Sequence, residues 1–175
     1  IARAKEILTA DEGLAAGAMR TLAIAAGMHE SRGKVIVPMD GDRQNDPADI
    51  GALLKKLDEG YACVSGWRKN RQDSGVKRIP SRMANTIVRR FARSPVHDLG
   101  CTIKAYRADA LDPRDLFGEM HRFIVLYVMA RGGKVGELVV NHRPRVAGVS
   151  KYGLSRTARV IADLLLVRAL LKYRT

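Results

Sequence analysis

Residues 35–50, VIVPMDGDRQNDPADI, pass from an apolar run through a cluster of polar residues into a second apolar pattern. The Val35–Val37 run has no polar alternation, which is typical of a strand covered on both faces in a parallel sheet. Asp46 followed by Pro47 offers an N-cap acceptor and a proline at the first helical position. The stretch therefore predicts a strand over 34–39, a polar loop and a helix.

Helix and strand patterns alternate along the rest of the chain. The helix after Pro47 is expected to end at Gly60 and to bury a stripe of Ile50, Leu53, Leu54 and Leu57. Further helices are predicted at 13–31, 79–93 and 119–131, and further strands at 61–66, 101–106 and 135–140. Elements of these lengths in this order predict an α/β sandwich with a largely parallel sheet.

The two ends of the sequence carry separate expectations. A doubly wound sheet begins with a strand, yet residues 2–8 have a helical pattern, so we expect an N-terminal part to be missing. The tight joints at 8–17 and 91–100 suggest omitted residues there as well. We expect one domain over 1–153 and a separate helix over 154–175.

Composition restricts the partners. Lys and Arg number 31 against 18 Asp and Glu, and the net charge of +13 favours phosphates, nucleic acid or an anionic membrane surface. Aromatic residues make up only 5% of the chain, and no DNA- or RNA-binding motif is present. Of these three classes of partner, nucleic acid is therefore the least favoured. Cys63 and Cys101 lack metal-ligand spacing and are predicted to be reduced core residues.

The polar loop after the first predicted strand favours a metal site. Residues i and i+2 of an extended segment point the same way, so Asp40 and Asp42 can both face the carboxyl edge of the sheet, where open α/β sheets bind ligands. Paired carboxylates suit Mg²⁺ or Mn²⁺, particularly when a substrate diphosphate completes the shell. The alternative is an acidic turn in which Asp40 caps and Asp42 is solvated.

Residues 40–47 resemble the D-x-D-x-Q-x-x-P stretch of family-two glycosyltransferases, in the polyprenyl-phosphate branch that includes dolichyl-phosphate mannose synthase. Four further stretches match in the family's order: Ser65 to Arg68, Lys77 to Ser81, Asp98 to Arg107 and Arg145 to Tyr152. The resemblance implies a glycosyltransferase A-type, Rossmann-like fold, a nucleotide-sugar donor and a divalent cation. It also implies transfer of a hexose to a polyprenyl phosphate, dolichyl or undecaprenyl.

The resemblance assigns roles residue by residue. The catalytic group is Asp40, Asp42 and Gln44, with Asp42 and Asp40 as metal ligands; the donor diphosphate is bound by Arg145, Ser150 and Lys151; the acceptor phosphate is bound by Arg68, Lys77, Arg78 and Ser81. His121 and Arg122 are candidates for the acceptor pocket, and a core position for His121 is an equal alternative. Each basic residue has the alternative of a solvated surface charge.

Some features depart from the family pattern. The first family strand and the residues that contact the nucleotide base are not in this sequence, and Arg43 replaces an apolar residue. The resemblance therefore assigns no residue of this sequence to the nucleotide base. A related enzyme acting on a soluble or polysaccharide acceptor is the runner-up interpretation.

The last predicted helix bears on localisation. Residues 154–175 combine a broad apolar face with Arg156, Arg159, Arg168, Lys172 and Arg174, a pattern typical of a helix in a membrane interface. Packing on the protein's own sheet is the alternative. We expect association with the cytoplasmic side of the cell membrane, and assembly into a homo-oligomer is left open.

Overall fold

The computed structural model describes residues 12–69, 94–144, 162–167 and 169–171 of the chain. Its labelled helices are α2 (Glu12–Glu30), α3 (Asp49–Leu57) and α5 (Ile124–Ala130), and residues 162–167 and 169–171 are also helical. Its strands are β1 (Val35–Ile36), β2 (Cys63–Trp67), β3 (Lys104–Arg107) and β4 (Val135–Val139). Single 3₁₀ turns cover Ala108–Ala110, Pro113–Asp115 and Met120–Arg122.

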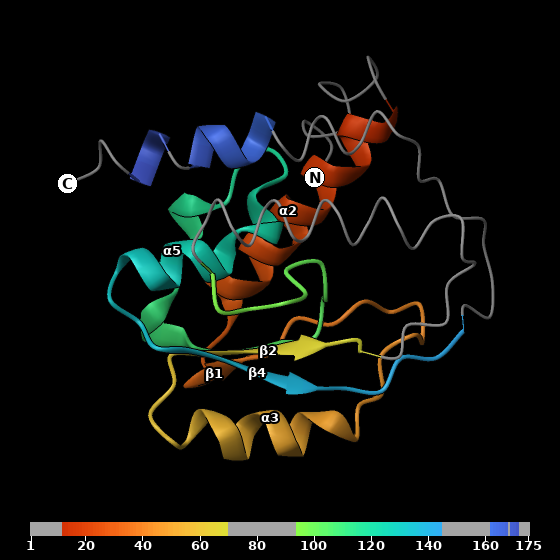
Figure 1. Cartoon of the computed structure of the whole chain (residues 1–175). Coiled ribbons are helices and arrows are strands. Elements are labelled where there is room, and N and C mark those ends of the chain that lie inside the picture. The colour runs from red at the N-terminus through yellow and green to blue at the C-terminus, as the bar shows by residue number, and fades with distance from the viewer. Residues whose placement is uncertain (1–11, 70–93, 145–161, 168, 172–175) are drawn as a thin grey trace.

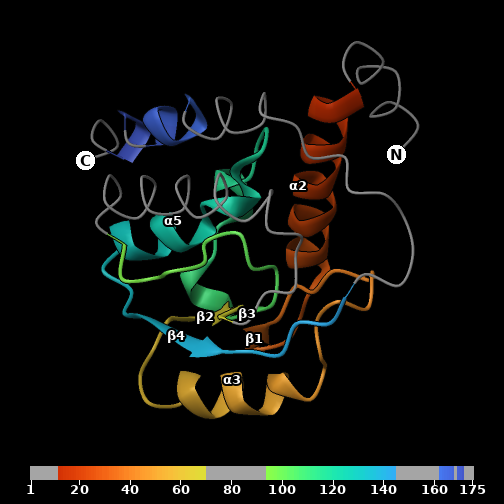
Figure 2. The same ribbon diagram turned by 45° about the vertical axis from the view of Figure 1, so that its right-hand side comes forward.

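The described elements form three layers, seen in Figures 1 and 2. The sheet lies in the middle, and α3 covers one of its faces. Helices α2 and α5 and the helical residues 162–167 and 169–171 lie on the opposite side. This arrangement confirms the predicted α/β class.

The four described strands lie in the order β1-β3-β2-β4. Strand β3 pairs antiparallel with both β1 and β2, whereas β2 and β4 are parallel. Strands β1, β2 and β4 therefore share one direction and β3 runs against them. The described sheet is therefore mixed: three of its strands share one direction, in line with the predicted largely parallel sheet, and β3 is reversed. The reversal was not predicted, because the sequence pattern of β3 carries no signal of its direction.

Side-chain alternation along the central strands divides the core in two. Cys63 of β2 and Tyr106 of β3 pack toward α5, in a cluster with Phe123 and Val125. The neighbouring residues of the same two strands, Val64 and Ala105, face the other way and pack with Leu53 and Leu57 of α3, together with Cys101, Ile103 and Val140. Cys63 and Cys101 are free and buried, as predicted, and burial raises the pKa of the Cys63 thiol to about 12.

Most predicted elements are present with shifted bounds. Strand β1 is shorter than the predicted 34–39, and Pro38, which has no N–H to donate, follows shortly after its end. The predicted helix at 119–131 is divided into a 3₁₀ turn, Met120–Arg122, and α5. The helix predicted at 79–93 lies outside the described residues.

The start of α3 differs from the prediction. The N-cap is Ala48 and not Asp46, and no side chain caps the helix. Asp46 Oδ1 instead accepts a hydrogen bond from the Ala48 N–H at 3.1 Å and closes a turn that precedes the helix. The C-terminal end is as expected, because Gly60 has a φ of 89°, a conformation that favours glycine.

Gly66, near the end of β2, allows a close approach of neighbouring strands. A Cβ at this position would lie 2.9 Å from both the Ile103 carbonyl oxygen and Val140 Cγ2, and 3.0 Å from Cys101 Sγ. The main chain of β2 and the segment that leads into β3, which contributes the Ile103 carbonyl, would have to move apart to admit a methyl group.

We expect Gly66→Ala to lower the free energy of unfolding by about 1–3 kcal/mol through overpacking, as measured by urea denaturation. Gly51→Ala is the matched control, because a Cβ at Gly51 of α3 meets nothing within 4 Å. In a helix, that change should stabilise the chain by about 0.5–1 kcal/mol. Equal effects of the two substitutions would contradict the close contact at Gly66.

Candidate functional site

Several polar side chains of the described region gather at one edge of the sheet. The carboxyl ends of β1, β2 and β4 lie at this edge, and the amino end of β3 reaches it because β3 runs the opposite way. Asn45, after β1, donates from Nδ2 to Thr102 Oγ1, before β3, at 2.9 Å. The reversed strand therefore brings the segment before it to the ends of the other three.

The Asp40–Gln44 loop follows β1. The Gln44 N–H donates to Asp42 Oδ1 at 3.1 Å, which closes a turn around Arg43. Arg43 has a φ of 61°, in the left-handed region that few residues other than glycine and asparagine adopt readily. The predicted catalytic residues thus lie on a tight turn held by one of their own carboxylates.

Asp40 lies next to a cation. Arg20 Nε, on α2, is 3.8 Å from Asp40 Oδ1, and both side chains are partly exposed. Within the described ranges, no group of three or more His, Cys, Asp or Glu side chains could hold a metal ion. The described residues therefore offer at most the two predicted carboxylates, Asp40 and Asp42, at this loop.

The segment after β4 pairs with the chain beyond Asp42. The Arg143 N–H donates to the Gln44 carbonyl at 2.8 Å, and Gln44 Nε2 donates to the Arg143 carbonyl at 3.4 Å. Arg143 also forms an ion pair with Asp46. The Asn141 N–H and Nδ2 donate to the two carboxylate oxygens of Asp49 at 2.8 and 2.9 Å.

These contacts affect charge as well as position. The pKa of the Asp46 carboxyl is lowered, first by the Ala48 N–H and then by the hydrogen bond from Arg143. Arg143 stands two residues before Arg145, a predicted donor-diphosphate ligand. The chain leading into that predicted motif is therefore tied to the Asp40–Gln44 loop.

Arg68, at the end of β2, forms a bidentate ion pair with Asp98. Nε donates to Oδ2 at 2.7 Å and Nη2 to Oδ1 at 2.9 Å, with side chains only 12% and 8% exposed. Burial raises the pKa of the Asp98 carboxyl, but the hydrogen bonds and charge of Arg68, with a smaller effect of Lys104, outweigh it and the pKa is lowered. Arg68 is therefore part of a buried pair, and its binding of the acceptor phosphate stays a prediction.

Lys104 is a second buried cation beside this pair. Its Nζ donates to the Leu99 carbonyl at 3.0 Å and also to the Cys101 carbonyl, so it closes the loop between Asp98 and β3. Burial lowers the pKa of Lys104.

His121 and Arg122 contact α2 and the turn before α5. Thr21 Oγ1 lies 2.8 Å from His121 Nδ1 and also donates to the Gly17 carbonyl at 3.2 Å. Arg122 Nη2 lies 2.8 Å from Glu119 Oε2, with both side chains largely buried. A hydroxyl has one proton, so His121 Nδ1 is the donor to Thr21. These contacts favour a packing role, and the acceptor-pocket role stays a prediction.

The other predicted site residues, Lys77, Arg78, Ser81, Arg145, Ser150 and Lys151, lie outside the described residues. Several residues that take part in these contacts or support them were not predicted: Arg20, Asn45, Asn141, Arg143 and, from the middle of β4, Glu137. The polar run Asn141–Arg143 directly follows a strand, the same signal that pointed to Asp40, and could have been recognised. Arg20 gave no such signal, because its neighbour Asp40 is distant in the sequence.

Comparison with known proteins identifies the family. Residues 20–114 match the profile of "Glycosyl transferase family 2". This chain belongs to glycosyl transferase family 2. The match confirms the resemblance to family-two glycosyltransferases that the sequence motifs indicated. Relatives in the polyprenyl-phosphate branch are also similar to this chain along most of its length.

One family-2 relative is a "Dodecaprenyl-phosphate galacturonate synthase" from Rhizobium johnstonii, 44% identical over 89% of this chain and 47% of its own length. Another is an "Undecaprenyl-phosphate 4-deoxy-4-formamido-L-arabinose transferase" from Shewanella sediminis, 36% identical over 82% of this chain and 43% of its own. The chain thus spans less than half the length of these relatives. A crystal structure of a mycobacterial protein aligns with a TM-score of 0.56, covering 85% of this chain and 51% of its own; at 15% identity this likeness concerns the fold alone.

We expect Asp98→Asn to lower the free energy of unfolding by about 3 kcal/mol at pH 7, because it leaves the buried Arg68 without its counter-charge. The native pKa of Asp98 lies below the unfolded value of about 3.9. The contribution is therefore complete above that pH and is lost as the pH falls through the native pKa. The difference in free energy of unfolding between wild type and variant, measured by urea denaturation, should therefore narrow as the pH falls below about 3.9.

Asp58→Asn, at the exposed C-cap of α3, is the matched control and should change stability little at either pH. A wild-type advantage over Asp98→Asn that stays constant with pH would contradict the ion-pair origin of the effect.

Proposed function

We propose that this chain forms the nucleotide-sugar domain of a transferase that moves a hexose from a nucleotide-diphosphate sugar to a polyprenyl phosphate, with Mg²⁺ or Mn²⁺, at the cytoplasmic face of the cell membrane. The observation that carries the proposal is the 44% identity to a dodecaprenyl-phosphate galacturonate synthase along 89% of the chain. The second relative, with its different sugar, shares a polyprenyl phosphate in its name. The acceptor class is therefore proposed with more support than the sugar.

The donor side is proposed to be the Asp40–Gln44 loop together with the segment after β4. Mg²⁺ commonly uses one or two protein carboxylates and completes its shell with substrate phosphates and water, so the pair Asp40 and Asp42 fits such an ion. When bound, the cation would neutralise charge that develops on the departing nucleoside diphosphate. Arg145 and Lys151 would add fixed positive charge on the same diphosphate.

The protein residues of the loop have their own tasks. Asp42 Oδ1 already accepts the Gln44 N–H, so one oxygen of this carboxylate shapes the turn. The guanidinium of Arg20 offsets part of the negative charge of Asp40. Arg143 holds Gln44 and Asp46 in place through its main chain and guanidinium.

The acceptor side is proposed to be the end of β2 and the predicted basic cluster. A phosphate monoester is largely ionised near pH 7, its second pKa being about 6, so the acceptor needs no strict general base. The chief requirement is to hold two anionic substrates close together. Arg68, Lys77, Arg78 and Ser81 would reduce their repulsion.

We expect Asp42→Asn to abolish metal-dependent binding and transfer while the fold survives. The amide oxygen of asparagine can still accept the Gln44 N–H, but the negative charge that binds a cation is lost. The thermal shift produced by nucleotide sugars with Mn²⁺ should vanish, and transfer to undecaprenyl phosphate should fall by about a hundredfold or more.

Asp109→Asn, an exposed carboxylate in the turn after β3, is the matched control and should retain both properties. A fully active Asp42→Asn protein would overturn the metal assignment. Equal transfer to a soluble acceptor would favour the runner-up interpretation.

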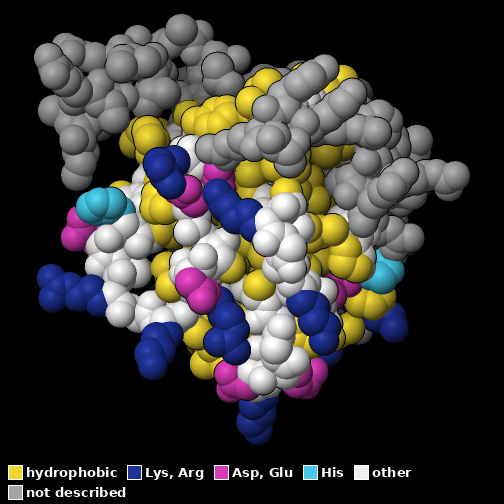
Figure 3. Space-filling view, turned by 90° about the vertical axis from the view of Figure 1, so that its left-hand side faces the viewer, with side chains coloured by type: hydrophobic (Ala, Val, Ile, Leu, Met, Phe, Trp, Pro, Cys, Tyr) yellow, Lys and Arg dark blue, Asp and Glu magenta, His cyan; other side chains and the backbone are white. Residues whose placement is uncertain are grey.

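The membrane part of the proposal rests on exposed apolar side chains. Met19 and Leu22 of α2 and Leu165 and Leu166 of the last helical segment are each 38–51% exposed. Both elements lie on the side of the sheet opposite to α3 (Figures 1 and 2). On the face in Figure 3, hydrophobic side chains gather toward that side and most charged side chains lie toward the α3 end.

Among the described residues, no helix combines the length and hydrophobicity needed to cross a bilayer.

We expect the chain to bind vesicles rich in anionic lipid and to be released as salt rises, because each nearby Lys or Arg contributes about 1 kcal/mol and this attraction is screened. Replacing both Leu165 and Leu166 with serine removes apolar surface that would be buried in the membrane. The partition coefficient between vesicles and water, measured by co-sedimentation, should therefore fall by about tenfold.

Val139→Thr is the matched control, since Val139 is 50% exposed on β4, away from that helix, and threonine keeps its shape. Absence of vesicle binding by the wild type at low salt would contradict the membrane proposal.

A further inference from the structure

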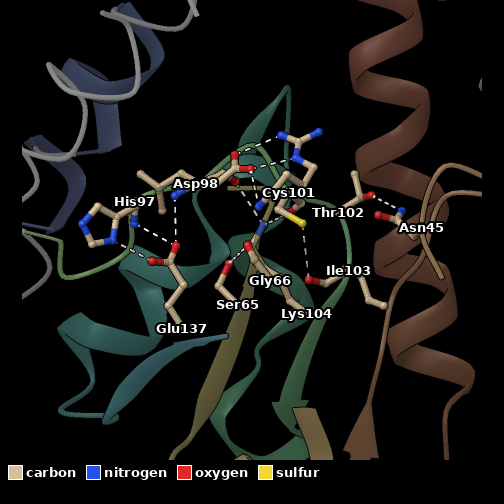
Figure 4. Close-up of polar contacts among 12 residues, drawn as sticks. Asn45, Ser65, Gly66, His97, Asp98, Cys101, Thr102, Ile103, Lys104 and Glu137 are labelled. Carbon is tan, nitrogen blue, oxygen red and sulfur yellow. Dashed lines mark hydrogen bonds and ion pairs between the residues drawn. The ribbon is translucent and has the colours of Figure 1, made fainter. Parts of the chain in front are cut away.

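Glu137, in the middle of β4, binds the segment that carries Asp98. Its Oε1 accepts the N–H groups of His97 and Asp98 at 2.8 and 3.0 Å. Its Oε2 lies 2.7 Å from His97 Nδ1 (Figure 4). The carboxylate is 10% exposed, and three donors from two consecutive residues converge on it.

This contact determines where Asp98 can lie. The main-chain N–H of Asp98 is fixed on β4, while its side chain holds the guanidinium of Arg68, the residue that follows the adjacent strand β2. Lys104 binds the next part of the loop through the Leu99 and Cys101 carbonyls. The chain around Asp98 is therefore held on both sides of this residue. Lys104 holds the part that follows it, and the carboxylate of Glu137 alone holds the part that precedes it.

We infer that Glu137 is a positioning residue, which fixes the Arg68–Asp98 pair where it meets the phosphate of the acceptor. The phosphate part of this inference rests on the proposed function; the hold of Glu137 on the pair rests on the contacts alone. A carboxylate accepts N–H bonds about twice as strongly as a neutral amide, so the charge of Glu137 matters as well as its shape.

The neighbouring aromatic rings supply a direct reporter. Trp67, the only tryptophan of the chain, stacks on His97 with ring centroids 4.5 Å apart and an interplanar angle of 15°. A carboxylate only accepts hydrogen bonds, so His97 Nδ1 carries the proton that points to Glu137. Movement of the 97–98 segment should therefore change both the Trp67 fluorescence and the His97 tautomer.

The test compares Glu137→Gln and Glu137→Ala with Glu59→Gln, an exposed glutamate that follows α3. The first readout is nitrogen NMR of the whole chain without substrate. In Glu137→Ala, the Arg68 Nε–H should exchange with solvent at least tenfold faster than in the wild type, because its partner Asp98 has lost its support. In Glu137→Gln, the amide can donate to His97 Nδ1, so neutral His97 should change to the Nε2–H tautomer.

The second readout is binding of undecaprenyl phosphate in detergent, followed through Trp67 fluorescence, with inorganic phosphate as a parallel probe. The dissociation constant should rise by about threefold in Glu137→Gln and about tenfold in Glu137→Ala, with Glu59→Gln unchanged. The double variant Glu137→Ala/Asp98→Asn should have nearly the same dissociation constant as Asp98→Asn alone, because both substitutions disrupt the same Arg68–Asp98 pair. Binding of the lipid but not of inorganic phosphate would assign recognition to the lipid ester.

The outcomes separate the two parts of the inference. Unchanged Arg68 exchange in Glu137→Ala overturns the positioning role, and additive effects with Asp98→Asn do the same. Faster exchange of the Arg68 Nε–H in Glu137→Ala supports the hold of Glu137 on Arg68, whatever the protein binds. If the wild type binds neither undecaprenyl phosphate nor inorganic phosphate, the acceptor assignment of the proposed function is overturned. Where Glu137→Ala does not fold, the His97 tautomer and phosphate affinity of Glu137→Gln decide, and wild-type values for both overturn the inference.

Discussion

The direction of β3 is the constraint on which the site depends. Strand β3 lies between β1 and β2 and runs against both. Its first residue, Lys104, therefore lies at the edge where β1, β2 and β4 end, and the preceding loop brings Asp98 to Arg68 and Thr102 to Asn45. Had β3 run parallel to its neighbours, this loop would lie at the opposite edge and no Arg68–Asp98 pair would form.

The same constraint explains how far the sequence could predict the structure. Apolar runs, a glycine stop and helical periodicity predicted the described helices and strands in their correct order, because these signals act over a few residues. The direction of β3 depends on pairing between residues about forty positions apart, such as Val64 and Ala105, and no local pattern encodes it. The Asp40–Gln44 loop was predicted because its residues are neighbours in the chain, whereas Arg20 and Arg143 reach it through tertiary contacts.

Burial changes the meaning of the charges that the sequence displays. Arg68 could be taken from the sequence as a surface cation, yet it and Asp98 are largely removed from water, as are Lys104 and Glu119. Breaking a buried ion pair costs several kcal/mol, whereas a well-packed apolar pair of the same shape is often no less stable. Stability alone therefore gives little reason for this chain to bury Arg68, Asp98 and Lys104 together at one edge, and the proposed binding of anionic substrates there would offer one.

Strand β4 and the residues that follow it connect the two parts of the candidate site, the Arg68–Asp98 pair and the Asp40–Gln44 loop. Strand β4 holds the Asp98 segment through Glu137 in its middle, and its continuation, Asn141 to Arg143, holds the chain that follows Asp42. Because the two supports lie only a few residues apart on one strand, a shift of β4 would displace both the Arg68–Asp98 pair and the Asp40–Gln44 loop. A transferase must keep donor and acceptor groups in fixed relation, since small misplacements of reacting groups are costly in rate. A single strand that positions both sides of the proposed site would meet this requirement without a direct contact between them.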